Sequence, residues 1–132
     1  MSENLRAPAL LLARVLLAII FVVSGYGKVM GYAGTMAEMT SAGLPAVQIL
    51  LPLTIAVELG GGLLLVLGLF TRPVALLIFL FLIPVTLVFH TSGDQMDQLM
   101  LMKNLAIMGG MLALAVAGAG TWSLDSRRGA SV

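Results

Sequence analysis

The chain has 132 residues, of which 60% are hydrophobic and only 10% are charged. A soluble domain carries about 25% charged residues, so this composition excludes an ordinary soluble fold and indicates a single membrane domain. The net charge of +1 offers no strong field for nucleic acid. The absence of cysteine excludes thiolate catalysis, disulfide exchange, cysteine-ligated zinc and iron–sulfur clusters.

The first long apolar segment covers residues 8–26 and predicts a membrane-spanning helix, since about 20 apolar residues cross the hydrocarbon core. We expect it to be retained rather than cleaved as a signal peptide, because Arg14 interrupts it and no convincing small-x-small cleavage site precedes Lys28. Two interpretations of Arg14 stay open. It either extends its side chain toward the interface or forms a salt bridge with Glu58.

The following loop, residues 27–44, has helical signals of its own. Thr35 followed three residues later by Glu38 fits a capping box, and Gly43 with Pro45 fits a helix stop. These signals predict a short helix over residues 35–42 that lies on the membrane surface.

The second apolar segment, residues 45–70, contains a single charge, Glu58, near its middle. An ionisable residue at this depth costs about 2.5–3.5 kcal/mol unless it has a partner or a function. Glu58 is therefore either a proton-active carboxylate that binds a ligand headgroup, or a structural group that holds helices in register.

Two further spans are predicted at residues 73–89 and 99–121, the first of them free of charged residues. The polar break at Thr71, Arg72 and Pro73 predicts a tight antiparallel hairpin between the second and third spans, with Thr71 capping the third. The sequence thus predicts an all-α membrane protein, a four-transmembrane-helix up-down bundle with a short interfacial helix in the first outer loop, forming one domain over residues 1–132.

Basic residues set the expected orientation of this bundle. The end that carries both termini holds Arg6, Arg72, Arg127 and Arg128, so the positive-inside rule predicts that both termini are cytoplasmic. Lys28, His90, Lys103 and Asn104 would then converge at the outer mouth. They could bind the carbonyl or hydroxyl groups of a quinone-like molecule, or they could be ordinary interfacial anchors, with His90 at a helix C-terminus. A single histidine does not indicate a metal site.

The chain resembles the DoxX family of small bacterial inner-membrane proteins over nearly its whole length. An ordered set of short stretches carries the resemblance: Arg14 with residues 24–28 (SGYGK), residues 31–35 (GYAGT), 57–62 (VELGGG), 68–72 (GLFTR), 89–90 (FH), 102–105 (MKNL) and 118–120 (GAG). The resemblance marks Arg14, Lys28, Glu58, His90, Lys103 and Asn104 as the positions of interest. The cost of burying polar groups in lipid selects the same six.

The resemblance also implies a class of function, because the family takes its name from a subunit of a terminal quinol oxidase and has relatives linked to thiosulfate:quinone chemistry. We therefore expect a quinone-associated redox subunit or accessory protein with no intrinsic cofactor, quinone as the candidate ligand, and a homo-oligomer or membrane redox complex as its setting. Two alternatives stay open: a non-enzymatic scaffold or stability factor for a membrane complex, and a small transporter or channel. No self-contained catalytic motif is present, so whether the protein is an enzyme stays undecided.

Overall fold

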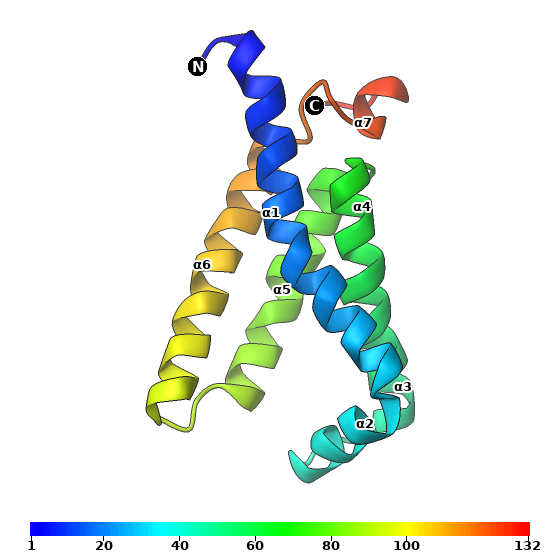
Figure 1. Ribbon diagram of the computed structural model, residues 1–132, viewed down its shortest axis with the longest axis vertical. Helices are drawn as coiled ribbons and strands as arrows, with labels where there is room; N and C mark the ends of the chain where they lie inside the picture. Colours follow the sequence, from blue (N-terminus) through cyan, green and yellow to red (C-terminus); the bar gives the residue numbers. More distant parts are fainter.

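The computed structural model describes all 132 residues, and every regular element in it is a helix (Figure 1). In chain order the elements are α1 (Glu3–Met30), α2 (Tyr32–Ser41), α3 (Val47–Ile55), the π-helix η1 (Ala56–Gly60), α4 (Gly61–Leu67), α5 (Thr71–Phe89), α6 (Gln95–Ala117) and α7 (Leu124–Arg127). Elements α3, η1 and α4 run on as one span, residues 47–67, so four helices are long and apolar enough to cross a membrane. The predicted four-helix, all-α class is confirmed.

Several of the predicted helix ends differ from those in the structure, and at two of them a local capping feature sets the end. Helix α1 continues past the predicted end at residue 26, so Lys28 lies in its last turn. The second span stops at Leu67 rather than residue 70, because Gly68 adopts the left-handed conformation (φ 68°) that ends helices. Helix α6 starts at Gln95, four residues early, because the side chain of Asp94 accepts a hydrogen bond from the Asp97 amide at 3.0 Å.

The short helix in the first loop is present, but it begins at Tyr32 and not at Thr35. The predicted capping box is wrong: the Thr35 hydroxyl donates to the Gly31 carbonyl within the helix at 3.1 Å. Gly43 ends the helix as expected, with φ of 80°. The buried side chain of Met39 holds α2 against α3.

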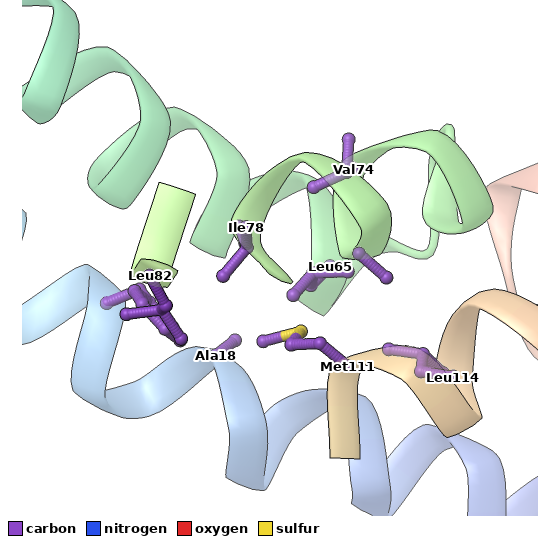
Figure 2. Packing of buried hydrophobic residues seen from close by; sticks show 9 residues of the cluster. Ala18, Leu65, Val74, Ile78, Leu82, Met111 and Leu114 are labelled. Atoms are coloured by element: carbon purple, nitrogen blue, oxygen red, sulfur yellow. The ribbon is translucent and has the colours of Figure 1, made fainter. Parts of the chain in front are cut away.

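Helix α1 crosses the bundle diagonally (Figure 1). Its first half crosses the C-terminal part of α6 (Figure 1), where the Leu17 side chain packs on Gly110. Its second half lies along η1 and α4. Fully buried side chains from all four spans, including Ala18, Leu65, Ile78 and Met111, meet in one core where the helices come together (Figure 2). Because α1 leaves α6 in this way, the α5–α6 hairpin and the α1–α3 pair diverge toward the end where α2 lies, here called the α2 end.

Gly25 permits the close contact between α1 and η1. A Cβ atom at this position would lie 2.7 Å from both the Cβ and the backbone nitrogen of Leu59. We therefore expect Gly25→Ala to lower the free energy of unfolding by about 1–3 kcal/mol through overpacking, measured by thermal unfolding in detergent. Gly27→Ala is the matched control, since its Cβ would meet nothing within 4 Å and should be neutral or stabilising.

The opposite end, where both termini lie, is here called the terminal end (Figure 1). Asp125 of α7 accepts hydrogen bonds there from the Phe70 and Thr71 amides, at 2.8 and 2.9 Å. Thr71 was predicted to cap α5, but it is the first helical residue, and the cap comes from Asp125, 54 residues away. Burial raises the pKa of Asp125, but hydrogen bonds from Thr71, Phe70 and Arg128 outweigh it and hold that pKa below its ordinary value.

This depressed pKa gives a pH dependence with a definite sign. The stabilisation by Asp125 is fully present above the pKa of an unfolded aspartate, about 3.9, and is lost as pH falls through the lower folded value. We expect Asp125→Ala to be less stable than wild type at pH 7 by about 1 kcal/mol, with the gap narrowing as pH falls below about 3.9. Thermal midpoints of both proteins across this range test it; a gap that stays constant on acidification would contradict the assignment.

Candidate ligand-binding pocket

Glu58 lies on the π-helix η1 and is almost completely buried, with 6% of its surface exposed. Its carboxylate forms a salt bridge with Lys28 of α1, whose Nζ lies 2.7 Å from Oε1 and 3.2 Å from Oε2. The ammonium faces both carboxylate oxygens, so the pair neutralises the charge that makes an isolated carboxylate costly in lipid.

The local backbone explains why these two side chains meet. A π-helix accommodates an extra residue within a helical turn and is frequent at functional sites; here it changes the direction in which Glu58 points relative to α3. Gly25, one turn before Lys28, lets α1 approach η1 closely enough for the lysine to reach the carboxylate. The salt bridge therefore depends on an irregular turn in one helix and a missing side chain in the other.

A cavity of about 450 Å³ adjoins the pair and is bordered by the end of α1, by α2, by α3 with η1, and by the second half of α5. Its walls are mostly apolar, with Met39, Leu50, Val57, Phe81 and Val85 among them. Its polar lining consists of Lys28, Thr35, Glu38, Thr54, Glu58 and His90. This volume and this mixture of apolar surface with a few polar groups are typical of small-molecule sites.

Three of the six predicted positions line this cavity: Lys28, Glu58 and His90. His90 follows the last residue of α5, and its Nδ1 lies 3.6 Å from Oδ1 of Asp97 on α6. The other two outer positions do not line the cavity. Asn104 is buried in the α5–α6 hairpin and donates to the Thr86 hydroxyl at 2.9 Å, while the Lys103 ammonium contacts the Met100 sulfur at 3.6 Å.

Arg14 is fully buried near the terminal end and does not contact Glu58. Its guanidinium donates to the Leu65 and Val66 carbonyls, each at 3.0 Å, and to the Trp122 carbonyl. Of the two interpretations left open for Arg14, the salt bridge with Glu58 is therefore wrong. Arg14 precedes Lys28 by 14 residues, or about 21 Å of helix, and η1 packs on the far part of α1. The arginine instead meets the carbonyls at the C-terminus of α4, where the helix dipole favours a cation.

Some of the cavity lining has no counterpart among the predicted positions. Thr54 lies four residues before Glu58 on the same span, a spacing that could have identified it as a neighbour in the pocket. Thr35 and Glu38 were assigned to a surface helix but also line the cavity. No sequence signal marks the π-helix, and the pairing of Glu58 with Lys28 depends on it.

Four apolar spans, three of which border a pocket with a buried polar pair, define a multi-pass membrane protein with a pocket inside its helix bundle. The chain belongs to the DoxX family: the family model described as DoxX matches residues 9–91. It is 41% identical over 124 residues to inner membrane protein YqjF of Escherichia coli K12, covering 93% of this chain and 94% of that protein. It is 35% identical over 128 residues to inner membrane protein YphA of the same organism, covering 92% and 91%.

No solved structure matches the chain. The match to the family model confirms the family resemblance seen in the sequence. Because it has four apolar helices and inner-membrane relatives, the protein is a multi-pass inner-membrane protein.

Proposed function

We propose that this protein binds a quinone-like headgroup in the pocket beside the Lys28–Glu58 pair, as a quinone-associated subunit or accessory of a redox complex or oligomer in the membrane. The observation that carries the proposal is an apolar cavity with a neutralised ion pair in its wall. A quinone carbonyl can accept a hydrogen bond from the Lys28 ammonium, and a quinol hydroxyl can donate to the Glu58 carboxylate. The ion pair can therefore form a hydrogen bond with the quinone or with the quinol.

The proposal concerns binding and positioning, because these are the roles that the pocket residues support. Lys28 is partly exposed, so its ammonium can donate to a ligand while it stays paired with Glu58. With both termini cytoplasmic, as the basic residues of the terminal end predict, the pocket would lie in the periplasmic half of the membrane. A partner protein would supply any redox cofactor.

Binding of a short-chain benzoquinone to the purified protein in lipid nanodiscs tests the proposal. We expect Lys28→Ala and Glu58→Gln each to weaken binding at least about tenfold, a difference of about 1.4 kcal/mol. Lys103→Ala is the matched control, because this lysine belongs to the same apolar bundle but lies outside the cavity.

Equal quinone affinity in wild type and in both pocket variants would contradict the proposal. If those variants instead lower thermal stability and disrupt partner co-purification, without any ligand effect, the structural scaffold becomes the better assignment.

A further inference from the structure

We propose that the pocket opens sideways to the lipid, between α3 and α5, and that its occupant is a membrane-dissolved molecule with an apolar tail and an uncharged polar head. This inference rests on the proposed function and adds to it the route of access and the charge of the ligand. Three observations carry it: the exposure of the cavity wall, the position of α2, and the charges that face the cavity.

The wall between α3 and α5 is part of the outer surface of the bundle. Leu53 and Val88 both line the cavity, yet 55% and 41% of their surfaces are exposed. Both lie within helices that are apolar enough to cross a membrane. Their exposed faces therefore meet lipid acyl chains, and an apolar tail could lie between them.

The helices on either side of this opening are irregular. Pro52 lies within α3, and Pro84, which also lines the cavity, lies within α5. A proline within a helix removes one backbone hydrogen bond and bends the axis. Both prolines lie beside the cavity, which occupies the space between the two helices.

Helix α2 lies across the end of the bundle that would otherwise open to water (Figure 1). Its Met39 is buried against Val47 and Leu51 of α3, and the same methionine lines the cavity. The helix therefore covers the side of the pocket that faces water, and the side between α3 and α5 stays uncovered.

The charges facing the cavity disfavour an anion. Two carboxylates, Glu38 and Glu58, face one lysine, and that lysine is already bound to Glu58. His90, the remaining titratable group in the wall, lies beside the Asp97 carboxylate. A fatty acid or an acidic lipid head would meet no free cation, whereas a neutral head with carbonyl or hydroxyl groups can use both members of the pair.

Because the chain contains no cysteine, single-cysteine variants can carry a nitroxide label at chosen positions in nanodiscs. Leu53→Cys reports on the opening, Glu38→Cys on the aqueous side, and Leu80→Cys on a lipid-facing part of α5 outside the cavity, exposed to a similar 53%. We expect the labels at positions 53 and 80 to collide with dissolved oxygen more often than with a water-soluble nickel chelate. The label at position 38 should collide more often with the nickel chelate.

A decyl-substituted benzoquinone then tests the occupant, with dodecanoate as the anionic comparison. We expect the quinone to immobilise the label at position 53, so that the mobile component of its spectrum disappears. The spectrum of the label at position 80 should stay unchanged. Dodecanoate should change neither spectrum. Because the label itself narrows the opening, Leu53→Trp and Leu80→Trp provide a second measurement. Quinone affinity should fall at least about tenfold in the first variant only.

Each outcome decides one part of the proposal. Water-type accessibility at position 53, or equal affinity in the two tryptophan variants, would overturn lateral access while the proposed quinone site stands. An equal response to dodecanoate would overturn the selection for an uncharged head. Lipid-type accessibility at position 53, together with no quinone binding by the unlabelled wild type, would leave the opening in place and refute both the proposed function and this occupant.

Discussion

Arg14→Met is expected to lower the free energy of unfolding by about 3 kcal/mol, the largest effect of any single side chain discussed here. The Arg14 guanidinium is fully buried and donates to three carbonyls, two at the end of α4 and one at Trp122. Methionine fills a similar volume but leaves the Val66 and Trp122 carbonyls without a donor, whereas the Leu65 carbonyl keeps its hydrogen bond from the Gly68 amide. Each buried unsatisfied polar group costs about 1–3 kcal/mol, and interhelical hydrogen bonds in membranes lie at the low end of this range.

Reversible unfolding in mixed micelles measures this effect, with Arg127→Met as the matched control. Arg127 is exposed in α7, so its replacement should change stability by less than about 0.5 kcal/mol. Arg14→Lys should lie between wild type and Arg14→Met, because an ammonium lacks the planar geometry that serves carbonyls on two chain segments. Equal stability of Arg14→Met and Arg127→Met would show that water or lipid satisfies the α4 carbonyls. Quinone affinity should stay unchanged in both.

Breaking the Lys28–Glu58 pair is the second large effect, and a double-mutant cycle is the appropriate measurement. Lys28→Met leaves the carboxylate without a cation, and Glu58→Gln leaves the ammonium without an anion, within spans where an unpaired charge costs about 2.5–3.5 kcal/mol. Each single variant should therefore lose about 2 kcal/mol of stability, since partial exposure of Lys28 reduces the full cost. The double variant removes both charges and should lose less than the sum.

The coupling energy expected from this cycle is at least about 1.5 kcal/mol. Lys103→Met serves as the control, because its ammonium contacts only the Met100 sulfur and should show no coupling to Glu58. Strict additivity of Lys28→Met and Glu58→Gln would contradict a pair formed within the bundle. The cycle reports on stability alone, so it is independent of whether the pocket binds a quinone.

The membrane fold could be predicted from the sequence because it follows from local properties of the chain. Four apolar runs of sufficient length specify four spans, and Gly43 marks a helix end through a conformation that glycine adopts readily. The depth of Arg14 and Glu58 could also be estimated, since position along a helix is proportional to residue number. Burial cost then identifies both as residues that need partners within the protein.

Which partners these residues find was decided only by the tertiary structure. Arg14 meets the end of α4 and Glu58 meets Lys28 because α1 crosses the bundle diagonally, and neither the crossing nor the π-helix at Glu58 has a sequence signal of its own. The same crossing separates α3 from α5 and leaves the cavity between them, while Lys103 and Asn104 remain in the α5–α6 hairpin. Residue spacing along a helix specifies depth and face, whereas contacts across helices depend on how closely and at what angle the helices pack.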